Sequence, residues 1–128
     1  MIPGKFEYHA PTALPEAIAL LDRYGDDAKL LAGGQSLIPM MRFRLAEPAH
    51  LVDIGRVSGL SYVRERDGYL CIGAMTCEAD VERSALIVDR YPILAETAAV
   101  IADPLVRNKA TIGGNLAHAD PATIIRPP

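Results

Sequence analysis

Residues 29–54 read KLLAGGQSLIPMMRFRLAEPAHLVDI, and this stretch decides the first part of the fold. An apolar run at 29–32 has the length of a short strand, and it stops at the glycine pair 33–34. Residues 36–41 are apolar enough to begin a short helix, and residues 50–54 form a second strand-like run. Strand, helical crossover and strand in this order predict a small parallel βαβ unit.

Working outward, Thr12 is predicted to cap a helix over residues 13–24, because Leu14, Ala17, Ile18 and Leu21 recur at helical spacing. Asp67-Gly68 lies between two strand-like runs, 61–66 and 69–73, and this dipeptide favours a type I′ hairpin turn. Further helices are expected from Thr76, as the cap, to about Arg83 and from Pro92 to about Ile101. The helix at 92–101 should turn Ile93, Leu94, Thr97, Ala98 and Ile101 inward. The chain is therefore an α+β protein with an expected subdomain boundary near Gly55.

Composition excludes several classes of protein. With 13 basic and 16 acidic residues the net charge is −3, so the basic footprint of a nucleic-acid-binding protein is missing. No apolar stretch approaches the ~18 residues of a membrane span, and the first residues do not form a secretory signal. Cys71 and Cys77 have no metal-binding spacing and are expected to be reduced thiols of a cytoplasmic protein.

Two similar segments are the best candidates for a binding site: Ala32-Gly33-Gly34-Gln35-Ser36 and Thr111-Ile112-Gly113-Gly114-Asn115. A glycine pair lets the backbone turn sharply, and successive N–H groups can then point into one concavity and hold a phosphate. A following helix would add its positive dipole end. Two such loops could hold a diphosphate together. The alternative is that both glycine pairs are ordinary turns, since neither segment has a dinucleotide-binding or Walker pattern.

The remaining polar candidates are weaker. His9, His50 and His118 are scattered without metal-ligand spacing, so we expect no metal site. Lys29, Arg107 and Lys109 flank the two glycine segments and could attract a diphosphate, although a solvated surface charge is the more usual role of such residues. No residue is predicted to act as a catalytic acid, base or nucleophile.

Several longer stretches are similar to those of one protein family. They are Met1-Ile2-Pro3-Gly4 with Phe6-Glu7-Tyr8-His9, residues 29–39, Ile72-Gly73-Ala74-Met75-Thr76, Ile101-Ala102-Asp103-Pro104, residues 111–115 and His118-Ala119-Asp120-Pro121. On these motifs the chain resembles the medium, FAD-binding subunits of aerobic molybdenum hydroxylases, most of all their carbon monoxide dehydrogenase branch. The resemblance covers residues 1 to about 122.

The resemblance implies the N-terminal part of a two-subdomain FAD-binding fold of the vanillyl-alcohol-oxidase type. Residues 1–55 would be the first FAD-binding subdomain, and residues 56–122 the start of the second. It implies that Ala32, Gly33, Gly34, Gln35 and Ser36, with Thr111, Ile112, Gly113, Gly114 and Asn115, bind the FAD diphosphate. Position 35 is often His in the family; Gln35 keeps hydrogen-bonding capacity but does not titrate.

The implied protein is an electron-transfer subunit. Its partners would be a large subunit with molybdopterin, where the substrate is oxidised, and a small subunit with two [2Fe–2S] clusters. FAD would receive the electrons and pass them to an external acceptor, so the cofactors would carry the chemistry.

The chain departs from the family in two respects. Medium subunits are about twice as long, and after Ala122 they tend to continue with Asn-Asp, whereas this chain has the atypical tail 123–128. We therefore expect a truncated chain that self-associates through the exposed face of its incomplete half. Two alternatives stay open: a fragment that binds no flavin and acts only as an inert or protein-interaction module, and a binder of a non-flavin nucleotide.

Overall fold

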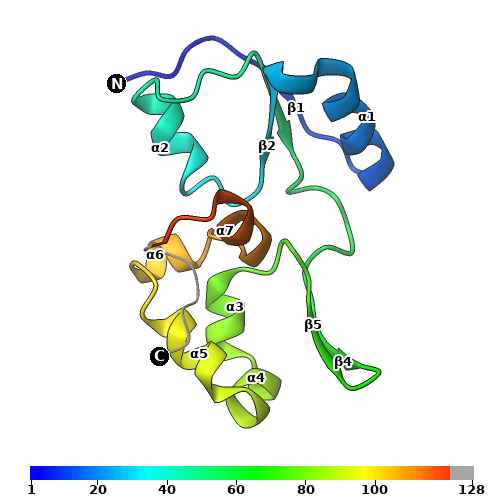
Figure 1. The fold of residues 1–128 in the computed structure, drawn as a ribbon, viewed down its shortest axis with the longest axis vertical. Helices are drawn as coiled ribbons and strands as arrows, with labels where there is room; N and C mark the ends of the chain where they lie inside the picture. The colour runs from blue at the N-terminus through cyan, green and yellow to red at the C-terminus, as the bar shows by residue number, and fades with distance from the viewer. Residues whose placement is uncertain (122–128) are drawn as a thin grey trace. The chain divides into compact units, whose positions relative to one another are not determined.

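The computed structural model describes residues 1–121, and the predicted tail at 123–128 lies outside them. The chain divides between Ser58 and Gly59 into two compact units, which are described separately (Figure 1). Among the described residues, no helix has both the length and the apolar character needed to cross a lipid bilayer.

The first unit is built on a three-stranded parallel sheet with the order β1-β3-β2. Its strands are β1 (Glu7–His9), β2 (Ala28–Leu31) and β3 (His50–Asp53), and α2 (Leu37–Arg42) lies in the crossover between β2 and β3. The predicted βαβ unit is therefore confirmed. Strand β1 adds an edge strand to this sheet, paired in parallel with β3.

Helix α1 (Leu14–Tyr24) covers this sheet and is followed by the 3₁₀ turn η1 (Gly25–Asp27). The predicted cap is wrong, because Ala13 occupies the N-cap position and no side chain caps the helix. The predicted inner face is also only partly right: Ala17 is buried, but Leu14 and Ile18 are exposed. A small residue at the contact lets the helix approach the strands closely, so the larger neighbours remain at its margin.

The second unit begins with an antiparallel hairpin of β4 (Val63–Arg66) and β5 (Tyr69–Ile72). Asp67 and Gly68 both have positive φ angles, +52° and +81°, which a type I′ turn requires. The predicted hairpin turn is confirmed.

Five helices follow: α3 (Glu78–Arg83), α4 (Ala85–Arg90), α5 (Pro92–Ala99), α6 (Pro104–Arg107) and α7 (Ile112–His118). Their core is Val81, Ile87, Ala95 and Ala98, against which Val63, Leu70 and Ile72 of the hairpin pack. The expected helix at Pro92 is confirmed, but its inner face is Ala95 and Ala98, while Ile93 is exposed. Helix α4 was missed, although Ser84 caps it by accepting a hydrogen bond from the Ile87 N–H.

Thr76 does not cap α3, as the sequence suggested. Cys77 is the N-cap residue, and the buried Thr76 hydroxyl bonds instead to the N–H and C=O of Tyr62, both at 3.0 Å. These two bonds fasten the start of α3 to the segment that leads into the hairpin. The Thr76 hydroxyl therefore makes a tertiary contact with Tyr62 instead of capping the helix that the local pattern predicted.

Candidate functional site

The first glycine segment, Ala32–Ser36, turns the chain from the end of β2 into α2. Gly34 has a φ of +77°, a backbone conformation that L side chains rarely adopt. A Cβ atom at this position would also lie 2.7 Å from Ile38 Cδ1 and 3.1 Å from Leu31 Cδ1. The dihedral angle therefore favours glycine at this turn, and a larger residue would also require the ends of the Ile38 and Leu31 side chains to move.

The donors of this turn are open. Within residues 1–121, no protein acceptor takes a hydrogen bond from the backbone N–H groups of residues 33–36, and no side chain caps α2. The Gln35 side chain donates to the Gly33 carbonyl at 3.2 Å, which steadies the turn without occupying those N–H groups. A run of open N–H groups before a helix is a setting that suits a phosphate oxygen. The segment therefore fits the diphosphate that the sequence assigned to it.

The second segment has a different structure from the one predicted. Thr111 is the N-cap of α7, and Ile112, Gly113, Gly114 and Asn115 form the first turn of that helix rather than a glycine loop. The Thr111 hydroxyl accepts a hydrogen bond from the Gly114 N–H at 3.1 Å, so it is an ordinary side-chain cap. The cap from Thr111 explains why α7 forms here, because it stabilises a helix whose first turn contains two glycines of low helix propensity.

The N–H groups of this turn are already used. Ile112 and Gly113 donate to the carbonyls of Thr76 and Ala74 at 3.0 and 2.8 Å, and Asn115 donates to the Thr111 carbonyl at 2.9 Å. With Gly114 bonded to the cap, no N–H in this turn is available as a phosphate donor.

Packing against Ala74 explains why position 113 holds glycine. A Cβ atom there would lie 2.8 Å from both the Cβ and the carbonyl oxygen of Ala74. Glycine thus allows α7 to pack directly on the chain between β5 and α3. An isolated bridge between Cys77 and Thr111 continues the same contact.

Asn115 connects the second segment to a buried acid. Its Nδ2 donates to Glu78 Oε1 at 3.1 Å, and Glu78 is completely buried at the first position of α3. Burial raises the pKa of Glu78, while the hydrogen bond from Asn115 lowers it by a smaller amount. Glu78 Oε2 has no hydrogen-bond partner among the described residues. Sequence reasoning missed Glu78, since an acid in the first turn of a helix is normally a surface residue.

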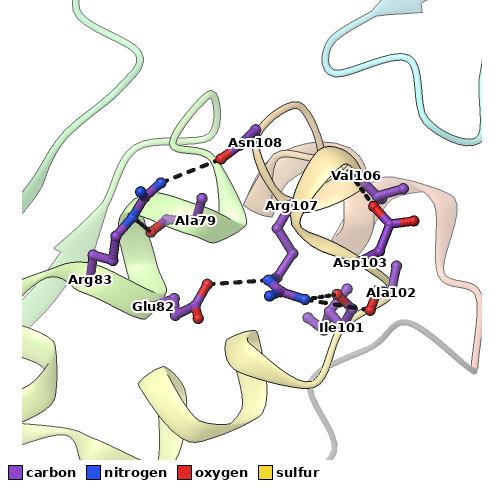
Figure 2. A network of polar contacts seen from close by, with 9 residues as sticks. All are labelled: Ala79, Glu82, Arg83, Ile101, Ala102, Asp103, Val106, Arg107 and Asn108. Atoms are coloured by element: carbon purple, nitrogen blue, oxygen red, sulfur yellow. Dashed lines mark hydrogen bonds and ion pairs between the residues drawn. The ribbon is translucent and has the colours of Figure 1, made fainter.

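Arg107 is neither a surface charge nor a phosphate ligand, which were the two interpretations of its position in the sequence. Figure 2 shows its side chain extended from α6 towards Glu82 on α3, which it meets at 3.1 Å, and towards the carbonyl of Ile101 at 3.0 Å. The guanidinium is mostly buried. These contacts tie α6, which precedes Thr111, to α3 and to the Ile101 carbonyl. Beside Arg107, Asp103 caps α6 by accepting a hydrogen bond from the Val106 N–H (Figure 2). Lys29 and Lys109 are exposed.

The histidines are not all scattered, as the sequence suggested. His9 and His50 lie on neighbouring strands with their ring nitrogens 3.2 Å apart, and Glu7 lies beside them. His118 is exposed on α7 and takes no part in this cluster. Both cysteines are free thiols, as expected.

The sequence of this chain is similar to those of known proteins of one family. The sequence profile of the family described as "FAD binding domain in molybdopterin dehydrogenase" matches residues 4–127. The carbon monoxide dehydrogenase medium chain of Hydrogenophaga pseudoflava is 55% identical over 121 residues, which are 94% of this chain and 42% of that protein. The 6-hydroxypseudooxynicotine dehydrogenase complex subunit alpha of Paenarthrobacter nicotinovorans is 49% identical over 95% of this chain and 41% of that protein.

A solved structure agrees with these sequence matches. The carbon monoxide dehydrogenase from Hydrogenophaga pseudoflava that lacks the Mo-pyranopterin moiety of the molybdenum cofactor superposes with a TM-score of 0.94 at 54% identity. The superposition covers 98% of this chain and 44% of the matched chain. The chain thus spans about two fifths of the length of the relatives that it matches.

Proposed function

The chain belongs to the family of FAD-binding domains in molybdopterin dehydrogenases, and from this membership we propose that it binds the diphosphate of FAD. Residues 32–36 of the first unit supply hydrogen-bond donors, and residues 111–115 of the second unit are the other segment that the family resemblance assigns to the diphosphate. The two units are, in this proposal, the two FAD-binding subdomains inferred from the sequence.

One observation carries the proposal: the N–H groups of residues 33–36 are open, in a turn whose positive φ angle at Gly34 favours glycine. Each phosphate oxygen accepts hydrogen bonds readily, and backbone donors can hold it without a neighbouring positive charge. The nearest cation in sequence, Lys29, is exposed, and Arg107 is engaged with Glu82. Within this segment, backbone dipoles therefore contribute most to diphosphate binding.

The proposed biological role is electron transfer within a molybdenum hydroxylase that is most like aerobic carbon monoxide dehydrogenase. When bound, FAD supplies a two-electron store that can be emptied one electron at a time. The residues of this chain bind and orient the cofactor, and none of them moves a proton in the reaction. An iron–sulfur small subunit would deliver the electrons, and a molybdopterin large subunit would oxidise the substrate.

The experiment is a titration of the purified 128-residue chain with FAD, followed by flavin fluorescence and isothermal titration calorimetry. ADP should compete with FAD, because it carries the same diphosphate, and riboflavin should not. Gly34→Ala should weaken FAD binding at least tenfold, because the new Cβ atom collides with Ile38 and Leu31 and displaces the donors.

Gly68→Ala is the matched control. Gly68 also has a positive φ angle, +81°, but a Cβ atom there would meet nothing within 4 Å, and the residue lies in the hairpin turn. Both variants bear a similar backbone strain of about 1–2 kcal/mol, so they differ in position and in the side chains that the new Cβ atom meets. Equal loss of FAD affinity in the two variants would refute the assignment of the donors. Uptake of ADP without FAD would favour a non-flavin nucleotide, and uptake of neither would favour the protein-interaction alternative.

A further inference from the structure

The first unit contains a second cluster of chemically active side chains, remote in sequence from the glycine segments. Glu7 and His9 alternate along β1 and therefore project from the same face of the sheet. Glu7 is the register partner of His50 at the start of β3, so His50 projects from this face as well. Parallel pairing of two strands 41 residues apart thus gathers three metal-ligand side chains at one edge of the sheet.

The three ligand atoms converge on one point. His9 Nε2 and His50 Nδ1 are 3.2 Å apart, His50 Nδ1 and Glu7 Oε2 are 3.4 Å apart, and His9 Nε2 and Glu7 Oε2 are 4.0 Å apart. The point in their plane that is equidistant from these atoms lies about 2.1 Å from each, close to the length of a Zn–N or Zn–O bond. A tetrahedral ion above the plane requires the exposed Glu7 carboxylate to move slightly closer to the two rings. A hydrogen bond between the imidazoles accounts for only the first of these distances.

The aromatic surroundings hold the ligands in place. The ring of Tyr24, from the end of α1, stacks on His50 with centroids 3.6 Å apart and an interplanar angle of 13°. Tyr24 also stacks on His9 at 5.4 Å. The side chains of His9 and His50 are 21% and 17% exposed, so their rings are restrained by packing. Ligands that are fixed before binding lose little entropy when a metal arrives.

We propose that Glu7, His9 and His50 bind a divalent transition-metal ion of the zinc type. Two imidazoles and one carboxylate are a ligand set that suits zinc, cobalt or nickel and that disfavours calcium and magnesium, which prefer oxygen ligands. The Glu7 side chain is 71% exposed, so solvent can supply the fourth ligand of a tetrahedral ion. The site is independent of FAD, and its ligands belong to one unit.

The test uses the full 128-residue chain without an affinity tag, titrated with Co²⁺ and with Zn²⁺. We expect one equivalent of Co²⁺ to produce the intense visible absorption of tetrahedral coordination, and Zn²⁺ to displace it. No sulfur-to-cobalt charge-transfer band should accompany this spectrum, because neither Cys71 nor Cys77 belongs to the cluster. A strong band of that kind would place the metal on the thiols and overturn the proposal.

Three variants and one control locate the site. His9→Gln and His50→Gln each remove a direct metal ligand. Each should lower the affinity for the metal ion by more than about 10–100-fold, which is the usual effect of losing a residue that only supports a ligand. Glu7→Gln, at an exposed position where folding is not at risk, should weaken binding about tenfold through the loss of one charge. His118→Gln removes an exposed histidine of α7 and should change nothing.

The far-ultraviolet circular dichroism of each variant separates loss of ligands from loss of fold. A wild-type chain that takes up no Co²⁺ or Zn²⁺ at millimolar concentration would show that the cluster is only a hydrogen-bonded histidine pair. Binding that survives both His9→Gln and Glu7→Gln in folded protein would equally refute the proposal, since each removes a separate ligand.

Discussion

Gly113→Ala is the substitution whose effect the structure predicts most sharply, because local and tertiary arguments give opposite signs. Gly113 is the second residue of α7, and alanine is favoured over glycine in a helix by up to about 1 kcal/mol. Helix propensity alone therefore predicts a more stable protein. The tertiary contact predicts the reverse, since the added Cβ would lie 2.8 Å from the backbone oxygen of Ala74.

The size of the loss in stability depends on which atoms must move to make room for the new Cβ atom. The obstacle is backbone rather than the end of a flexible side chain, so relief requires α7 to shift away from residues 73–75. Overpacking of this kind costs about 1–3 kcal/mol. The shift also lengthens the 2.8 Å hydrogen bond from the Gly113 N–H to the Ala74 carbonyl, which is worth about 1 kcal/mol. The propensity gain offsets the hydrogen-bond term, so we expect a net loss of about 1–3 kcal/mol.

Thermal unfolding followed by circular dichroism measures this loss. For a unit of this size, a loss of about 1–3 kcal/mol lowers Tm by roughly 5–25 °C. Ala74→Gly removes the Cβ on the other side of the contact but leaves the carbonyl, so the double variant should recover part of the loss. A Gly113→Ala protein as stable as the wild type, or more stable, would refute the close-packing argument for this glycine.

The remaining predictions concern single polar contacts in the second unit. Burial raises the pKa of Glu78, so its stabilising contribution is present at low pH and is lost as pH rises through the folded-state pKa. Glu78→Gln should abolish that loss, and parallel pH-stability curves for wild type and variant would contradict it. Asp103→Ala removes the cap that accepts the Val106 N–H at 3.0 Å, and it should reduce the free energy of unfolding by about 1 kcal/mol. Urea titration measures it, and no change would mean that α6 does not need its cap.

The sequence predicted those parts of the fold whose signals are local. The βαβ unit follows from two apolar runs and a short amphipathic crossover, all within residues 28–53. The hairpin follows from Asp67-Gly68, where both residues take the positive φ angles that the dipeptide favours. In each case the residues that decide the structure are neighbours in the chain, so their pattern carries the information.

Prediction failed where a residue is used by a distant partner. Thr76 has the pattern of a helix cap, but Tyr62, fourteen positions earlier, takes its hydroxyl. The histidine cluster depends on the parallel pairing of β1 with β3, which no local pattern indicates. Glu78 is buried because α7 returns to cover it with Asn115. These are register and packing effects, and they exist only once the chain has closed on itself.

The two glycine segments look alike in sequence, and the structure shows that they do different physical work. The first leaves its N–H groups open, and its glycine is favoured by a positive φ angle beside the flexible ends of two side chains. The second satisfies its N–H groups internally, and its glycine is required by the backbone of Ala74. Loss of FAD binding in a Gly113 variant would therefore follow from displacement of α7, and it should appear together with a lower Tm. Loss in a Gly34 variant should exceed what its change in Tm explains, because the donors themselves are displaced. Measuring stability and FAD affinity on the same samples separates a residue that binds the cofactor from one that holds α7 in place.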